Sequence, residues 1–313
     1  MHTRVRNRTR RQAAILLAAV TLLTSGAIAE AEKRMTVTTA TSKLNVCITG
    51  ESEKDTVLLI HGGPGVPDYL KDVAALLPGR NRTVRFDQRG TGASIAIGGS
   101  FRPEEYVQDI DAILQALGTE RVHLFGHSWG GLLAQIYAAY RPDRVKSLFL
   151  ASPSSGTGKV WAEMEKEVMA YNKKKATGTQ WLGVGLNSFL GMLGSDRAYQ
   201  RMFMQIWSYY FLDPRTAPAA DEGWLEGIRA LAVNGTRRGI LDFDNRAWEA
   251  RLSGLNVPVL VTYGAYDIYG ESRRYTFERW PAAKQVRMEH AGHLPWIQDQ
   301  KAFVELLREF YGN

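Results

Sequence analysis

From about residue 36 the sequence alternates between short, β-prone apolar runs and longer segments with helical spacing. Buried strands are predicted for DTVLLIHGG at 55–63, RVHLFGHS at 121–128 and RVKSLFLASPS at 144–154. Between them, RPEEYVQDIDAILQALG at 102–118 has the spacing of an amphipathic helix and ends on a glycine. Apolar strands that alternate with helices predict an α/β fold, in which a mostly parallel sheet is covered by helices on both faces.

This alternation stops near Ser154 and resumes near residue 251. The intervening segment is rich in Trp, Met and Tyr, and it has helical spacing without a convincing strand. We therefore expect one α/β core, formed by residues 35–153 and 251–313, that is interrupted by a helical cap at 154–250. Such a cap forms an apolar core of its own, and it is also suited to roof a pocket, because pockets favour interfaces between domains.

The first 29 residues have the three parts of a secretory signal peptide. Five arginines without an acidic residue precede the apolar run AAILLAAVTLL at 13–23, and the small residues Ala27 and Ala29 follow. The run is shorter than the roughly 20 residues that a membrane-spanning helix needs. We expect cleavage after Ala29 and a secreted or periplasmic protein, exported by the Sec route or, given Arg10-Arg11, the twin-arginine route. An uncleaved N-terminal anchor is the alternative.

The formal net charge of +7 comes mostly from this segment, because removing its five arginines leaves about +2. A nearly neutral chain offers no electrostatic footprint for nucleic acid. We expect a small-molecule or short-peptide substrate as the partner, and no stable membrane association after signal cleavage. Cys47 is the sole cysteine, so no intramolecular disulfide is possible, and it is interpreted as a buried strand residue. The sequence does not set the oligomeric state.

Ser128 lies in the pattern Gly126-His127-Ser128-Trp129-Gly130, between a predicted strand and a predicted helix. A serine hydroxyl is a weak nucleophile that needs an adjacent base, which is itself oriented by a third group. The G-x-S-x-G pattern places serine on a strained turn above a sheet, where small flanking residues avoid clashes. We interpret Ser128 as a nucleophile; the alternative is an ordinary turn residue.

The expected partners follow in the chain order serine, acid, histidine. Asp267 lies just past the predicted strand VPVLVTYG, and His293 just past the predicted strand KQVRMEH. Both therefore lie at carboxyl ends of strands, where open α/β sheets build their sites. His290 is the rival base, and Asp242 and Asp244 are the rival acids.

An oxyanion intermediate would need backbone N–H donors. We expect one from Trp129, directly after the nucleophile, and one from Gly63 in the glycine-rich loop HGGPG, with Gly62 as the fallback. His61 and His127 flank these donors rather than oppose Ser128, so both are interpreted as residues that brace the loops. No metal-ligand constellation is visible, and no cofactor is expected.

Together these motifs resemble the α/β-hydrolase superfamily, and more narrowly its proline iminopeptidase-like branch of serine peptidases. The resemblance extends over the core on both sides of the cap. The matching motifs are HGGPG at 61–65, FDQRGTGAS at 86–94, GHSWGGLLAQIYAAYRPDRV at 126–145, GAYD at 264–267 and GHLPW at 292–296.

The resemblance implies an inserted helical cap, with Ser128 as nucleophile, Asp267 as orienting acid and His293 as base. It also implies that Asp87 and Arg89 of the DQRG motif brace the loops of the site.

The cap departs from this branch, whose aminopeptidases hold the free amino terminus of the substrate with cap carboxylates. A Trp-x-x-Trp-Glu element found in one subgroup is absent, because IWSYYFLDP at 206–214 has no Glu. Glu222 and Glu226 are the candidate replacements; the alternative is that both lie on a solvated helix face. A serine nucleophile argues against dehalogenase and epoxide hydrolase chemistry.

The sequence therefore predicts an exported serine hydrolase that works through an acyl-enzyme. The first hypothesis is an aminopeptidase of the proline iminopeptidase type, which acts on small peptides or amides. The second is an esterase, lactonase or C–C bond hydrolase that acts on small apolar molecules with the same mechanism. The third is a non-catalytic binding protein on the same fold.

Overall fold

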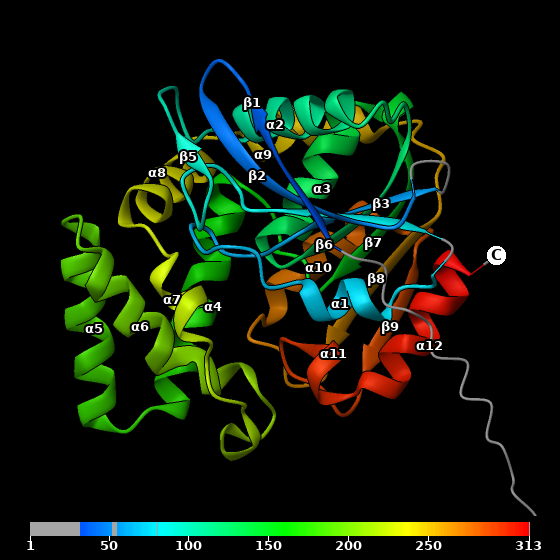
Figure 1. Ribbon diagram of the computed structural model, residues 1–313. Coiled ribbons are helices and arrows are strands. Elements are labelled where there is room, and N and C mark those ends of the chain that lie inside the picture. The colour runs from blue at the N-terminus through cyan, green and yellow to red at the C-terminus, as the bar shows by residue number, and fades with distance from the viewer. Residues whose placement is uncertain (1–31, 52–54, 80, 313) are drawn as a thin grey trace, which may run out of the picture. The chain divides into compact units, whose positions relative to one another are not determined.

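The computed structural model describes residues 32–51, 55–79 and 81–312. The predicted signal peptide, residues 1–29, lies outside these described residues. Ala31–Asn313 form one compact unit of the chain, and the fold below is that of this unit (Figure 1). In the described part of the chain, no helix combines the length and the apolar character needed to cross a bilayer.

The described residues form a nine-stranded sheet in the order β1-β2-β4-β3-β6-β7-β8-β9, with β5 beside β2. Strands β4, β3, β6, β7, β8 and β9 pair in parallel, whereas β2 pairs antiparallel with β1, β4 and β5. The bounds are β1 (Lys33–Thr38), β2 (Ser42–Thr49), β3 (Thr56–Ile60), β4 (Arg82–Phe86), β5 (Ile95–Ala96), β6 (Val122–His127), β7 (Val145–Ala151), β8 (Val259–Gly264) and β9 (Lys284–Met288).

Helices cover both faces of this sheet, which confirms the predicted fold class. Strand β3 shows the reason, because all its apolar side chains are buried and successive ones point to opposite faces. Leu58 and Ile60 pack in the core cluster that contains residues of α2 and α3. Val57 and Leu59 pack in the cluster that contains residues of α1 and α12. The helices around the sheet are α1 (Lys71–Leu76), α2 (Pro103–Ala116), α3 (Trp129–Tyr140), α10 (Arg274–Arg279), α11 (Pro295–Gln298) and α12 (Gln300–Tyr311).

The segment between β7 and β8 is helical, and we refer to it as the cap. Its helices are α4 (Gly158–Lys175), α5 (Gly178–Met192), α6 (Asp196–Trp207), α7 (Glu222–Glu226), α8 (Ala230–Leu241) and α9 (Asn245–Glu249). Helices α5 and α6 lie farthest from the sheet in Figure 1. Helix α9 instead packs on α3, and its Trp248 is fully buried in the core cluster of that face. The last part of the cap segment therefore also covers the sheet.

Candidate active site

Ser128 occupies the turn between β6 and α3, with a φ of 56° and a ψ of −124°. This positive φ is unusual for a residue with a side chain and matches the strained turn that the sequence predicts. The flanking glycines are required by close packing. A Cβ at Gly126 would lie 2.5 Å from the carbonyl oxygen of Gly130, and one at Gly130 would lie 2.0 Å from that of Ile60. The turn therefore holds the Ser128 hydroxyl in one place above the sheet.

His293 and Asp267 come together from the loops that follow β9 and β8. The His293 Nδ1 nitrogen donates to the Asp267 Oδ1 oxygen at 3.0 Å, and both side chains are buried. The backbone N–H of His293 donates to the carbonyl of Tyr210 in the cap at 2.9 Å. The sequence-predicted acid and histidine are thus paired, with the ring fixed by the core on one side and the cap on the other.

The Ser128 hydroxyl bonds to the hydroxyl of Tyr269, at 3.0 Å. The same tyrosine oxygen lies 2.7 Å from the Ser154 Oγ oxygen. The Tyr269 ring packs edge-on against the His293 ring, and its backbone N–H donates to Asp267 Oδ1 at 3.2 Å. Burial raises the pKa of Tyr269 well above its usual value, so the phenol keeps its proton. Tyr269, which the sequence analysis missed, therefore contacts all three predicted catalytic residues.

The backbone N–H groups of Gly63 and Trp129 are the candidate oxyanion donors that the sequence predicts. Hydrogen bonds among the described residues leave the N–H groups of Gly63 and Trp129 unpaired, whereas Gly62 N–H donates to the Tyr69 hydroxyl at 2.9 Å. Gly63 has a φ of 146°, which favours glycine, and it lines the same cavity as Ser128. The geometry therefore favours Gly63 over the fallback Gly62.

Two buried histidines brace the loops around these donors. The His127 Nε2 nitrogen lies 2.8 Å from the carbonyl oxygen of His293, and its Nδ1 lies 2.5 Å from the Tyr69 hydroxyl. The His61 Nε2 nitrogen accepts from the backbone N–H of Gln88 at 3.1 Å. Burial lowers the pKa of both His61 and His127, so both rings stay neutral at neutral pH.

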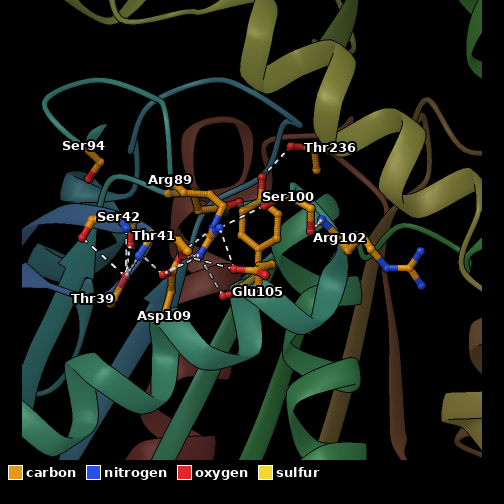
Figure 2. A network of polar contacts seen from close by, with 12 residues as sticks. Thr39, Thr41, Ser42, Arg89, Ser94, Ser100, Arg102, Glu105, Asp109 and Thr236 are labelled. Atoms are coloured by element: carbon orange, nitrogen blue, oxygen red, sulfur yellow. Dashed lines mark hydrogen bonds and ion pairs between the residues drawn. The ribbon is translucent and has the colours of Figure 1, made fainter. Parts of the chain in front are cut away.

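The DQRG loop is held by a buried ionic network (Figure 2). The Arg89 guanidinium makes two hydrogen bonds to the Asp109 carboxylate, at 2.7 and 2.8 Å, and one to the Glu105 carboxylate at 3.1 Å. Both acids lie on α2, so the network ties the loop to the helical layer of the core. Asp87 accepts from the backbone N–H groups of Asp68 and Ala93. These contacts fit the bracing role that the resemblance implies for Asp87 and Arg89.

A cavity of about 540 Å³ lies under the cap and contains Ser128 and His293 in its wall. Its size is that of a small-molecule site. Most of its wall is apolar and comes from cap helices. The charged pair in the wall is Glu165 and Arg237, joined by two hydrogen bonds of 2.7 Å. The apolar cap residues of the wall include Trp161, Met164, Val168, Met169, Trp181, Val184, Met192, Met202, Phe203, Ile206, Trp207, Trp224 and Val233.

The acid loop is also fixed from the cap. The Glu167 carboxylate of α4 accepts from the backbone N–H groups of Gly270 and Ser272, at 3.0 and 3.1 Å, and from the Ser272 hydroxyl at 2.6 Å. This carboxylate therefore satisfies two backbone donors directly after Asp267 and Tyr269, and it couples the position of the cap to that of the acid loop.

The other sequence candidates lie elsewhere. His290, Asp242 and Asp244 are exposed, and the Asp244 side chain accepts from the backbone N–H of Arg246 at the start of α9. Glu222 and Glu226 are exposed and do not line the cavity that contains Ser128.

Sequence reasoning missed Tyr269, Glu165 and Arg237. For Tyr269 the signal was its place two residues after the predicted acid. For the ion pair no local signal exists, because its members are 72 residues apart.

This arrangement of sheet, cap and site agrees with the comparisons with known proteins. Residues 55–300 match the family model described as the alpha/beta hydrolase fold. The chain belongs to this α/β-hydrolase family.

Within the family, the resemblance to proline iminopeptidases is confirmed. The proline iminopeptidase of Clostridioides difficile is 26% identical over 277 residues, which covers 84% of this chain and 92% of that protein. A hydrolase from Pseudomonas aeruginosa superposes with a TM-score of 0.65 at 23% identity, covering 90% of this chain and 98% of that one. The carboxylesterase CesB (YbfK) of Bacillus subtilis superposes with a TM-score of 0.62 at 17% identity, covering 90% and 93%. The two structures share the fold.

Proposed function

We propose that the protein is a serine hydrolase in which Ser128 is the nucleophile, His293 the base and Asp267 the residue that orients the base. The observation that carries this proposal is the occurrence of three features around the cavity that Ser128, His293 and Gly63 line. These are the strained turn at Ser128, the His293–Asp267 hydrogen bond of 3.0 Å, and the unpaired N–H groups of Gly63 and Trp129. A binding protein would have no need of this combination.

In the proposed mechanism the Ser128 proton passes to His293 Nε2, the ring nitrogen that Asp267 does not engage, as the Ser128 oxygen attacks the substrate carbonyl. The carbonyl oxygen takes up negative charge and accepts from the Gly63 and Trp129 N–H groups. His293 then gives the proton to the leaving group, and the bond between the carbonyl carbon and that group breaks. A water molecule, deprotonated by His293, hydrolyses the acyl-enzyme and regenerates the serine.

The first candidate substrate is a small peptide or amide with a free N-terminal residue, as the names of the curated relatives suggest. A free amine needs a carboxylate to bind it, and within the described wall of the cavity that carboxylate belongs to Glu165. We infer that Glu165, rather than Glu222 or Glu226, would hold the amine. Arg237 would then share Glu165 with the substrate.

A second candidate, the hydrolysis of esters of small apolar acids, is favoured by the same ion pair. Two hydrogen bonds of 2.7 Å already pair the Glu165 carboxylate with Arg237, which leaves the cavity without a net charge for an amine to bind. The remaining wall is rich in Trp, Met and Val side chains that suit an apolar acyl group.

Paired chromogenic substrates distinguish these candidates. A prolyl or alanyl arylamide with a free amine and a short acyl ester would be tested with the wild type and Ser128→Ala. Arylamide turnover that disappears on N-acetylation supports the aminopeptidase, whereas turnover of the ester alone supports the esterase. Turnover that persists in Ser128→Ala contradicts the nucleophile assignment, and no turnover of either substrate favours a binding protein.

Glu165→Gln tests the amine anchor. For an aminopeptidase this change raises the KM of the arylamide about tenfold or more, because a charged hydrogen bond is lost, and it leaves ester hydrolysis unchanged. Glu163→Gln is the matched control, since Glu163 lies on the same helix but pairs with Arg274 outside the cavity. Equal effects of the two substitutions would contradict the role of Glu165.

We also propose export of the protein with removal of residues 1–29. The arginine-rich start, the short apolar run and Ala27 and Ala29 support this proposal. N-terminal sequencing of the protein from the producing cell should give Glu30 as the first residue. An intact N-terminus on the mature protein would contradict cleavage.

A further inference from the structure

Helix α5 carries no charged residue from Gly178 to Met192, and one of its apolar faces is exposed. Four side chains recur along this face and its C-terminal end at intervals of four, three and four residues, which places them on one side of the helix. Scattered surface leucines are ordinary, but an aligned row of large apolar side chains marks an interaction site. The row consists of Leu182, Leu186, Phe189 and Leu193, with exposed fractions of 73, 60, 54 and 71%; we call it the α5 stripe.

The opposite side of the same helix lines the cavity that contains Ser128. Trp181, Val184 and Met192 are among the residues of the cavity wall, and Val184 is buried in a small apolar cluster with Ile206 of α6. Helix α5, which lies at the margin of the cap (Figure 1), is thus apolar on both sides: one side lines the cavity and the other is exposed. A helix that is apolar all round is normally covered on every side.

Basic residues lie before and after the α5 stripe. Between residues 168 and 212 the chain has five Lys or Arg residues and one acidic residue. Lys173 and Lys174 are exposed at the end of α4, directly before α5, and Arg197 and Arg201 are exposed on α6, directly after it. The acidic residue, Asp196, is engaged by the backbone N–H of Ala230 at 2.6 Å. An apolar row with positive charge at both ends is complementary to an anionic surface with an apolar interior.

We propose that the α5 stripe docks the protein onto the surface of an anionic lipid bilayer. In this arrangement the four apolar side chains enter the boundary between headgroups and acyl chains, while Lys173, Lys174, Arg197 and Arg201 contact anionic headgroups. A second copy of the chain fits the stripe less well, because it would bring two sets of like charges together. From the sequence alone we expected no stable membrane association after signal cleavage; the exposure of the α5 stripe is visible only in the fold.

One consequence rests on the proposed function. A helix that touches lipid on one side and the Ser128 cavity on the other would let an apolar substrate pass from the bilayer into the cavity. The substrate class that follows is a carbonyl compound with an apolar acyl group that partitions into lipid. Docking itself is measured without turnover, so its failure is distinguishable from failure of the hydrolase assignment.

The test is vesicle flotation of the protein without residues 1–29, because residues 31–313 form one compact unit and the removed segment is itself apolar. Vesicles of phosphatidylcholine alone are compared with vesicles of phosphatidylcholine and phosphatidylglycerol. We expect binding to the anionic vesicles that weakens with added salt and little binding to the neutral ones. Absence of binding to anionic vesicles at low salt overturns the proposal.

Substitutions assign the binding to the stripe. Leu186→Ser with Phe189→Ser should lower the partition coefficient about tenfold or more, because two large apolar side chains are lost from the lipid boundary. Ile95→Ser with Ile97→Ser is the matched control, since these side chains are similarly exposed, at 56 and 55%, on the β5 segment of the core. Equal loss of binding in both double variants would contradict docking through α5.

Substitutions of the lysines leave the apolar side chains of the α5 stripe unchanged and test the proposed contact of the basic residues with anionic headgroups. Lys173→Gln and Lys174→Gln should each lower binding to anionic vesicles about fivefold. Light scattering coupled to size-exclusion chromatography then tests the alternative occupant. A wild-type dimer that becomes a monomer in the Leu186→Ser, Phe189→Ser variant, together with no vesicle binding, would assign the stripe to a second copy and overturn the proposal.

Discussion

Replacement of Tyr269 by Phe tests how the nucleophile is supported. The phenol lies between two serines, at 3.0 Å from Ser128 Oγ and 2.7 Å from Ser154 Oγ. It has one proton to donate, and burial keeps that proton in place by raising the pKa of Tyr269. If Ser154 donates to Tyr269, then Tyr269 donates to Ser128, whose own proton is left for His293. The hydrogen bond would strengthen as negative charge develops on the Ser128 oxygen during attack.

The magnitude follows from the charge of the acceptor. A hydrogen bond to a charged group contributes about 1.5–3 kcal/mol, which corresponds to roughly a 10- to 150-fold change in rate. We therefore expect Tyr269→Phe to lower kcat by about this factor, with little change in KM, because the hydrogen bond that is lost is made to the nucleophile.

The assay is steady-state hydrolysis of whichever chromogenic substrate the wild type turns over, with thermal unfolding as a check on folding. Ser154→Ala is the graded control. This variant keeps the hydrogen bond from Tyr269 to Ser128 and removes only the Ser154 hydroxyl that polarises the phenol. We therefore expect kcat to decrease about threefold. An unchanged or increased kcat in Tyr269→Phe would refute the reasoning and would show that the phenol only holds the resting serine.

Three further predictions concern the framework. Burial lowers the pKa of His61 and His127, so both rings are neutral in the folded protein. In the unfolded chain both rings take up a proton more readily. As the pH falls below about 6.5, the free energy of unfolding should therefore decrease by up to about 1.4 kcal/mol per pH unit for each ring. Urea unfolding at a series of pH values below about 6.5 measures this decrease, and it should be smaller in a His127→Gln variant. A free energy of unfolding that does not change with pH in the wild type would contradict the prediction. Gly130→Ala should destabilise the fold by about 2 kcal/mol or more, because the new Cβ would lie 2.0 Å from a carbonyl oxygen, whereas Gly185→Ala, with nothing within 4 Å, should be neutral or stabilising. Glu167→Gln should lower both the midpoint of thermal unfolding and kcat, because the amide replaces one of the two acceptor oxygens that hold the acid loop. If neither value changed, the acid loop would keep its conformation without Glu167.

Much of the fold was predictable because its signals are local. The alternation of apolar strands and helices predicted the mostly parallel sheet. Its two covered faces are confirmed in β3, where every residue is buried and successive side chains enter opposite core clusters. The positions of Ser128, Asp267 and His293 were predictable because each lies in the turn or loop that follows a strand. The place of the last cap helix was harder to predict, because α9 packs on α3 through the buried Trp248 and helical spacing alone does not reveal this contact.

The rest of the site depends on contacts between distant segments. The hydroxyls of Ser128 and Tyr269 are joined across 141 positions of the sequence, and Glu165 and Arg237 across 72. An acidic residue on a helix predicts a solvated face as readily as a substrate contact, and for this reason Glu222 and Glu226 were candidates while Glu165 was not. Packing of the cap over the sheet decides which carboxylate enters the cavity.

The central claim is that Ser128 forms an acyl-enzyme with the help of His293, and the most direct measurement is intact-protein mass spectrometry during turnover of an activated ester. The proposed mechanism predicts one added acyl mass that maps to the peptide containing Ser128, is absent in Ser128→Ala and forms far more slowly in His293→Ala, while His290→Ala behaves as the wild type. An adduct on another residue, or turnover with no dependence on Ser128, would contradict it.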